Sequence, residues 1–139
     1  MIRDSKPEDI EAIMQLWLAV NVDTHHYVAK EYWHKNYDMV KAAISEGVYV
    51  YEEQGEILGF LGCIDSYIAG IFVQKENRSK GIGKHLVDYT KDKFNCLSLD
   101  VYCNNAKAIE FYQREGFHIT DTHLNHDTGL EEHRMEWKR

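Results

Sequence analysis

The stretch that decides the fold runs from Val73 to Lys84 and reads VQKENRSKGIGK. An apolar run ends at Val73 and helical spacing begins at Ile82, which predicts a turn from a strand into a helix. Gly81 and Gly83 let the backbone approach a ligand without a Cβ in the way. Free N–H groups at a helix N-terminus attract anions, and basic side chains stand beside them. The stretch fits a phosphate cradle, and it also fits an ordinary strand-to-helix turn.

Two familiar phosphate-binding patterns do not fit this turn. A Walker A loop needs a glycine five positions before its Gly-Lys pair and a hydroxyl residue after it, but Arg78 and His85 occupy those places. The dinucleotide pattern GxGxxG begins well at Gly81 and Gly83, but Leu86 replaces its third glycine. A phosphate cradle here would have to be of another kind.

A second stretch, from Asn104 to Phe117, reads NNAKAIEFYQREGF. Asn105 is a preferred residue for the N-cap of a helix. Ala108 and Tyr112 lie one turn apart on one face of that helix. Gly116 can end the helix in a left-handed conformation. Taken alone, Tyr112 also fits a core tyrosine.

Working outward, periodicity predicts the order of elements ααβββαβαββ. The expected helices span residues 6–22, 29–45, 82–94 and 106–115, and the expected strands span 48–51, 57–64, 67–73, 97–102, 117–123 and 132–137. Turns at Gln54-Gly55 and Asp65-Ser66 make an antiparallel meander of the first three strands. Ser5 and Glu8 have the spacing of a capping box. We therefore expect an α+β fold, with a mixed, mostly antiparallel sheet of six to seven strands flanked by about four helices.

Composition limits the class of protein. The 139 residues suit one domain, 1–139, and carry a formal net charge of −7, which disfavours a nucleic-acid-binding surface. No apolar run approaches the length of a membrane span, and no apolar signal core follows Met1. Three cysteines without a CxxC pair argue against a disulfide framework. A cytoplasmic location without membrane partners is expected.

Together the two stretches resemble the GNAT superfamily of N-acetyltransferases, and small single-domain bacterial members in particular. Arg78, Gly81 and Gly83 match the family's R/Q-x-x-G-x-G/A loop. The segment from Asn105 to Phe117 matches its second motif, with one strand between the two motifs. The resemblance implies acetyl-CoA as co-substrate and direct acetyl transfer to a primary amine in a ternary complex.

The resemblance also implies roles for individual residues. The backbone at three positions would pair with the pantetheine arm, and a backbone N–H near Phe72 would bind the carbonyl oxygen. Asn105 would contact the pantetheine, and Tyr112 would donate a hydrogen bond or a proton to the thioester sulfur. The three pantetheine positions are Ile71, Phe72 and Val73. The backbone positions expected to hold the pyrophosphate are Arg78, Ser79, Lys80, Gly81, Ile82 and Gly83.

The general base stays open. Many family members carry a glutamate on the strand that ends at residue 73, but residues 67–73 contain no carboxylate. Alternation from Ile71 predicts that Tyr67 faces the cleft on the acceptor side. Asp65, His25 and a water chain remain as proton acceptors. The eight histidines show no metal-ligand spacing, and we expect no metal. A covalent route is disfavoured because no cysteine (Cys63, Cys96 or Cys103) stands beside an evident base.

The function is also open among three hypotheses, two of which differ in the acceptor. A protein or peptide lysine is favoured by the acidic balance and by Tyr27, Tyr32 and Trp33, which can flank a lysine stem. A small-molecule amine, such as a polyamine or an antibiotic, is the first alternative. A non-catalytic acyl-CoA-binding module is the second, although binding alone does not need a donor such as Tyr112.

Overall fold

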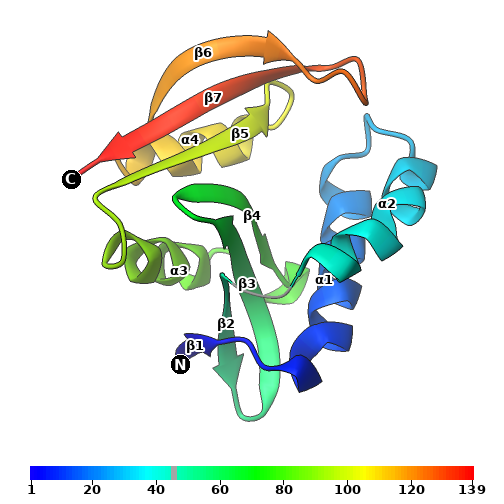
Figure 1. Cartoon of the computed structure of the whole chain (residues 1–139), viewed down its shortest axis with the longest axis vertical. Helices are drawn as coiled ribbons and strands as arrows, with labels where there is room; N and C mark the ends of the chain where they lie inside the picture. The colour runs from blue at the N-terminus through cyan, green and yellow to red at the C-terminus, as the bar shows by residue number, and fades with distance from the viewer. Residues whose placement is uncertain (45–46) are drawn as a thin grey trace.

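A computed structural model describes residues 1–44 and 47–139 (Figure 1). The helices are α1 (Ile10–Thr24), α2 (Lys30–Ala43), α3 (Ile82–Lys91) and α4 (Ala106–Arg114), with short 3-10 turns at Pro7–Asp9 and Lys75–Asn77. The strands are β1 (Ile2–Asp4), β2 (Val48–Glu53), β3 (Glu56–Ile64), β4 (Tyr67–Val73), β5 (Cys96–Tyr102), β6 (His118–Leu124) and β7 (Glu131–Lys138).

Seven strands form one sheet in the order β1-β2-β3-β4-β5-β7-β6. Every neighbouring pair is antiparallel except β4 and β5, which are parallel. The expected mixed, mostly antiparallel sheet with four helices is therefore confirmed. The strand that periodicity did not predict is β1, because three residues are too few to show alternation. It pairs with Tyr49–Tyr51 of β2.

Each face of the sheet is covered by its own pair of helices (Figure 1). On one face, α3 and α4 pack against residues such as Leu61, Leu97 and Leu99. On the other face, α1 and α2 pack against Val50 and Phe60. Burial of these apolar side chains is the main source of stability, at roughly 25 cal/mol per Å². The two cores lie on opposite sides of the strands, which lets the sheet present different chemistry to each face.

The first helix starts differently from the expectation. Pro7 begins a 3-10 turn, which moves the cap by one residue from Ser5 to Lys6. The Lys6 N–H donates to the Asp9 carboxylate at 2.7 Å, and Arg3 pairs with the same carboxylate at 2.8 Å. Arg3 thereby holds the pKa of Asp9 below its usual value. The prediction of a Ser5–Glu8 capping box was wrong. The second helix ends at Ala43, and residue 45 of the expected range lies outside the described residues.

The sheet opens between its two parallel strands. In β4 an extra residue, Ala69, has no partner in β3, because Gly70 pairs with Gly62 and Ile68 pairs with Cys63. Such a bulge bends a strand and increases its twist. Accordingly β4 and β5 pair only at Tyr67–Ser98 and Ile68–Leu99, and they part beyond these residues. Figure 1 shows β4 diverging from β5 towards α1.

Candidate active site

The glycine-rich turn leaves a series of backbone N–H groups without backbone acceptors. The Arg78 N–H donates to the Lys75 carbonyl, and the next such bond in the described chain runs from the His85 N–H to the Gly81 carbonyl. Ser79 and Gly81 both adopt positive φ, at 66° and 83°. Alternation of this kind turns successive N–H groups inward to form an anion-binding concavity. The geometry of the turn is compatible with binding an anion.

The two glycines of this turn serve different ends. A Cβ added at Gly81 would meet nothing within 4 Å, so its role is conformational and it leaves the approach to the backbone open. A Cβ added at Gly83 would lie 3.4 Å from the Phe111 ring. Gly83 therefore faces α4, and its small size accommodates the contact between two helices.

Basic side chains of the turn already have partners within the protein. The Arg78 guanidinium lies 3.3 Å from the Asp23 carboxylate, and its Nε donates to the Val73 carbonyl at 3.3 Å. Lys80 donates to the Asn77 side chain. Lys84 pairs with Glu115 at 3.3 Å. The Arg78–Asp23 pair is solvent-exposed and worth at most about 1 kcal/mol, so an incoming anion can displace it.

The free edge of β4 carries two residues whose backbone groups face the opening. The Gln74 N–H donates to the Leu58 carbonyl of β3, and hydrogen-bonding direction alternates along an antiparallel strand. By this alternation the backbone groups of Phe72 point to β3, and those of Ile71 and Val73 point to the opening. A backbone N–H near Phe72 was expected to bind the reacting carbonyl, and Phe72 itself was expected to pair with the pantetheine arm. The strand pairing leaves the neighbours Ile71 and Val73, and not Phe72, as the available positions.

Tyr112 belongs to the core on the α3–α4 face, against which Ile71 and Val73 also pack. Its side chain is only 8% exposed, and burial raises the pKa of its hydroxyl. Its ring contacts Phe111 and Phe117 edge-on. Among the described residues its hydroxyl has no hydrogen-bond partner, although that oxygen is not fully enclosed. A protonated phenol without a protein partner is available to a ligand atom.

Tyr67 lies on the opposite face of the sheet. The bulge at Ala69 interrupts the alternation, so Ile68 and Ile71 share the α3–α4 face and Tyr67 points to the other side. The expectation that Tyr67 shares a face with Ile71 was wrong for this reason. The Tyr67 hydroxyl donates to Asp100 Oδ2 at 2.7 Å. Burial, and then this bond, raises the pKa of Tyr67.

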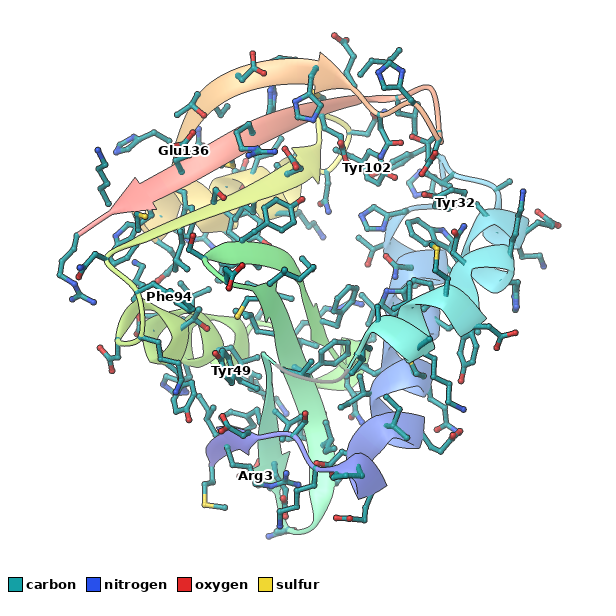
Figure 2. All side chains as sticks on the ribbon, viewed as in Figure 1. Arg3, Tyr32, Tyr49, Phe94, Tyr102 and Glu136 are labelled. Atoms are coloured by element: carbon teal, nitrogen blue, oxygen red, sulfur yellow. The ribbon has the colours of Figure 1, made fainter. Side chains whose placement is uncertain are left out.

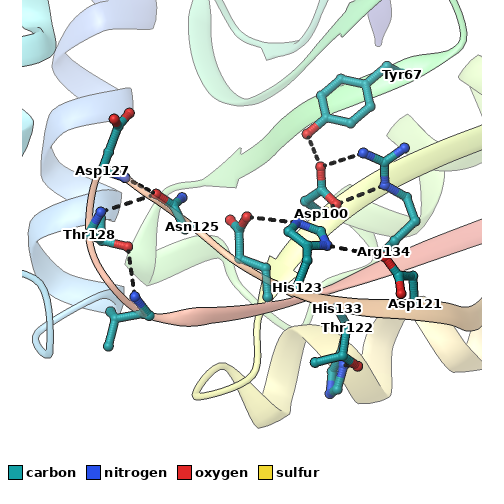
Figure 3. A network of polar contacts seen from close by, with 12 residues as sticks. Tyr67, Asp100, Asp121, Thr122, His123, Asn125, Asp127, Thr128, His133 and Arg134 are labelled. Carbon is teal, nitrogen blue, oxygen red and sulfur yellow. Dashed lines mark hydrogen bonds and ion pairs between the residues drawn. The ribbon is translucent and has the colours of Figure 1, made fainter.

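Asp100 is the centre of a polar network that Figure 3 shows in detail. Arg134 donates to both carboxylate oxygens, at 2.8 and 3.1 Å. His123 Nε2 lies 3.4 Å from Asp100 and 3.3 Å from Glu132. The Asp100 side chain is 13% exposed. Its carboxylate is thus enclosed by Tyr67, Arg134 and His123.

Sequence reasoning missed Asp100. The only available signal was one carboxylate in the apolar alternation of Leu99 and Val101, which could equally mark a solvent-facing position. Its importance depends on the long-range contacts to Tyr67 and Arg134, which one strand's sequence does not reveal. Asp65, an earlier candidate for proton acceptor, lies in the exposed turn between β3 and β4.

His25 lies in the connection from α1 to α2. Its ring packs against Tyr27, Trp33 and Tyr102 at centroid distances of 5.7, 5.5 and 5.2 Å. Burial lowers the pKa of His25 to about 4. Figure 2 shows Tyr32 and Tyr102 in this region, where the loop between β6 and β7 approaches the start of α2. A neutral histidine with so low a pKa is a poor general base.

Asn105, by contrast, is tied to two partners. Its side-chain oxygen accepts the Ala108 N–H at 3.2 Å, which caps α4. Its side-chain nitrogen lies 3.5 Å from His25 Nε2. One N–H of the amide thus stays free among the described contacts, so the residue can still donate to a ligand.

Thiol and metal chemistry find little support in the described residues. Burial raises the pKa of the Cys63 and Cys103 thiols, which makes them weak nucleophiles. Within residues 1–44 and 47–139, no group of three or more His, Cys, Asp or Glu side chains is placed to hold a metal ion. None of the helices in those ranges has both the length and the apolar character needed to cross a bilayer.

A groove of about 950 Å³ lies elsewhere, between α1, the β2–β3 hairpin and the segment after β4. Leu16, Ile57 and Gln74 contribute to its wall. Of the stretch from Val73 to Lys84, it is lined by Gln74, Lys75, Glu76 and Arg78, and neither Tyr67 nor Tyr112 lines it. The chemistry described above is therefore located by hydrogen-bonding groups and strand geometry, not by the groove.

Comparison with known proteins gives the class of this chain. A family model for the acetyltransferase (GNAT) domain matches residues 45–119. The peptidyl-lysine N-acetyltransferase YiaC of Escherichia coli K12 is 34% identical over 99% of this chain and 96% of its own length. The chain belongs to the GNAT acetyltransferase family. The expected activity, acetyl-CoA-dependent N-acetyl transfer, is confirmed at this level.

Two further relatives define the likeness in fold. The peptidyl-lysine N-acetyltransferase YjaB of E. coli K12 is 26% identical over 86% of this chain and 82% of its own length. The solution structure of apo-form YjaB aligns with a TM-score of 0.86 at 22% identity, covering 99% of this chain and 96% of that one. A PaiA N-acetyltransferase from Thermoplasma acidophilum, crystallised with coenzyme A, aligns with a TM-score of 0.78 at 21% identity, covering 100% and 98%.

Proposed function

We propose that this protein acetylates lysine side chains of proteins or peptides, and that the opening between β4 and β5 is where transfer occurs. One observation carries the proposal. Tyr112 lies on the α3–α4 face, in the core against which Ile71 and Val73 pack, and the Tyr67–Asp100 pair lies on the opposite face of the sheet. A donor group for the leaving sulfur and an acceptor group for the amine proton would thus act from opposite faces of the sheet.

The residues present fit acetyl-CoA. The N–H groups of residues 79–84 and the positive end of α3 would hold the pyrophosphate. Ile71 and Val73 would pair their free backbone groups with the amides of the pantetheine arm, as a neighbouring strand would. The remaining N–H of Asn105 would donate to the same arm. Acetyl-CoA supplies a thioester, whose carbonyl carbon takes the amine and whose sulfur leaves.

Tyr112 serves the leaving sulfur. Its hydroxyl stays protonated at neutral pH because burial raises its pKa, and it has no partner in the described protein to compete for its proton. A thiolate leaves more readily when a donor meets it, and general-acid assistance is worth about 10² to 10⁴ in rate.

Tyr67 and Asp100 serve the amine. A lysine ammonium, with a pKa of about 10.4 in water, must lose a proton before it can attack. The Tyr67 oxygen takes that proton while its own proton passes to Asp100, so the phenol never becomes charged. Arg134 holds the carboxylate in place through two hydrogen bonds. His123 links Asp100 to the more exposed Asp121, which offers a way out for the proton.

The surroundings suit a lysine stem and its charge. Tyr32 lies at the start of α2, on the side proposed for the acceptor. Burial raises the pKa of its hydroxyl, and the nearby charges of Asp127 and Glu132 raise it further. Burial raises the pKa of Tyr102 to about 12. Aromatic walls with carboxylates behind them attract an ammonium on an aliphatic stem. Both YiaC and YjaB carry the description peptidyl-lysine N-acetyltransferase.

The test compares kcat/KM for a lysine peptide with a blocked N-terminus against spermidine and an aminoglycoside, at low and high salt. We expect the peptide to be preferred by at least tenfold, and kcat/KM for the cationic peptide should fall as salt screens the acidic site. A tenfold preference for either small amine would overturn the lysine assignment and leave the acetyltransferase intact.

A further inference from the structure

A chain of side-chain hydrogen bonds connects α1 with the start of α4. The Asn21 side-chain nitrogen donates to the Trp17 carbonyl at 2.9 Å, and its oxygen lies 3.1 Å from His25 Nδ1. His25 Nε2 in turn lies 3.5 Å from the Asn105 side-chain nitrogen. The Asn105 oxygen accepts the Ala108 N–H at 3.2 Å. The chain thus spans 84 positions, from residue 21 to residue 105.

The directions of these bonds are fixed from both ends. The Trp17 carbonyl can only accept, so Asn21 must turn its nitrogen to it and its oxygen to His25. The Ala108 N–H can only donate, so Asn105 must turn its oxygen to it and its nitrogen to His25. His25 therefore carries its proton on Nδ1 and accepts at Nε2. Its desolvated, neutral state agrees with this tautomer.

Among residues 1–44 and 47–139, no polar group besides Asn21 and Asn105 makes a hydrogen bond to the His25 ring. Tyr27 Oη and Trp33 Nε1, the two buried polar atoms nearby that lack a partner in the described chain, make no hydrogen bond to it. The ring contacts Tyr27, Trp33 and Tyr102 only through aromatic faces and edges. The two asparagines are thus its polar partners within the described residues.

We infer that His25 is a positioning residue, which holds the Asn105 amide in one orientation so that its second N–H points to the cofactor. Without an acceptor at Nε2, the amide nitrogen would be free to turn away from that direction, although the cap to Ala108 could remain. His25 belongs to the acceptor-side connection between α1 and α2. The His25–Asn105 contact therefore joins the proposed acceptor side to the proposed cofactor side. This inference rests on the proposed contact between Asn105 and the pantetheine arm.

The chain offers closely matched variants. The side-chain oxygen of His25→Gln reaches about as far as Nε2 and preserves an acceptor for Asn105. His25→Asn reaches only as far as Nδ1 and preserves the contact to Asn21 alone. His25→Leu removes both contacts and keeps an apolar side chain among the aromatic rings. Asn105→Ser keeps a capping oxygen for α4 but has no amide N–H. His26→Gln alters the exposed neighbour and serves as a control.

Acetyl-CoA affinity is measured by calorimetry, and kcat is measured at saturating cofactor. We expect His25→Leu and His25→Asn to weaken acetyl-CoA binding by about fivefold to tenfold, the effect of one lost hydrogen bond, with kcat nearly unchanged. His25→Gln and His26→Gln should bind as the wild type does. In the Asn105→Ser background, His25→Leu should have no further effect, because residues acting through one contact are not additive.

Two results would overturn the inference. One is additivity of His25→Leu with Asn105→Ser, which would show that His25 acts by another route. The other is a ¹⁵N spectrum of the His25 ring at neutral pH that places the proton on Nε2. The ring spectrum needs no cofactor. If the wild type failed to bind acetyl-CoA, the proposed function would fall while the hydrogen-bond chain was still tested.

Discussion

The hydroxyl of Tyr67 and the carboxylate of Asp100 are 2.7 Å apart across two strands that have just stopped pairing. Tyr67 is opposite Ser98, and Asp100 is the first residue of β5 beyond the last pair. The bond therefore stands at the mouth of the opening, on the face away from Tyr112. In the proposed mechanism, deprotonation of the amine and protonation of the leaving sulfur thus occur on opposite faces of the sheet. Each step can therefore be tested with its own variants.

Asp100→Asn should lower kcat/KM by about 10² to 10³ near neutral pH, because the amide cannot take the amine proton. The residual rate should rise about tenfold per pH unit up to the pKa of the free amine, since only amine already neutral in solution can react. Tyr67→Phe should give a similar profile, and the double variant should lose little more. The measurement is a pH–rate profile with a blocked lysine peptide. Additive losses in the double variant would separate the two residues.

Tyr112→Phe should lower kcat by about 10² to 10⁴ with acetyl-CoA affinity nearly unchanged. The ring and its contacts with Phe111 and Phe117 remain, and the hydroxyl has no hydrogen-bond partner to lose among the described residues. Stability should therefore change little. Pre-steady-state and steady-state rates with the same peptide provide the measurement. Wild-type turnover in this variant would reduce Tyr112 to a core residue.

Gly81→Asp should abolish the rise in melting temperature that acetyl-CoA produces, which for the wild type corresponds to about 2.7 kcal/mol at one hundred times the dissociation constant. The carboxylate would meet the phosphate, and the open space around this position leaves room for the side chain. Gly81→Asn is the matched control, because asparagine tolerates positive φ without adding charge. A cofactor-dependent shift that persists in a folded Gly81→Asp variant would remove the phosphate cradle.

His25 should make stability depend on pH. Its pKa is about 4 in the folded protein, against an ordinary value of 6.5, so the unfolded chain binds more protons between these values. The free energy of unfolding should therefore fall as pH drops from 6.5 towards 4, by about 3 kcal/mol in all. Denaturation across this range should show a shallower slope in His25→Gln, while His26→Gln keeps the wild-type slope. Equal slopes in wild type and His25→Gln would contradict the buried, neutral ring.

The fold was largely predictable because its signals are local. Alternation located the strands, and the expected bounds of β4, Tyr67–Val73, agree with the structure. Gly116, at φ 93°, stands where the end of α4 was expected. By contrast, β1 depends on pairing with β2 some fifty positions away. Its three residues contain too little pattern to find without that partner.

The sequence could predict the candidate site only where its residues form a contiguous motif. The turn from Arg78 to Gly83 and the helix with Tyr112 are read from contiguous residues. The face of Tyr67 was not, because a single extra residue at Ala69 reverses the alternation and nothing in the local sequence announces a bulge. Asp100 and His25 gain their meaning from partners on other elements. The roles proposed for them therefore depend on contacts between elements that one segment of sequence does not reveal.

The free edge of β4 has a consequence for the end of the reaction cycle. Ile71 and Val73 would hold the pantetheine arm, which acetyl-CoA and its product, free coenzyme A, have in common. The protein would thus bind coenzyme A through the same backbone hydrogen bonds that bind acetyl-CoA. Because acetyl transfer does not alter the pantetheine amides, coenzyme A can dissociate only when these hydrogen bonds break. We expect accumulated coenzyme A to compete with acetyl-CoA for these backbone groups and to inhibit the enzyme.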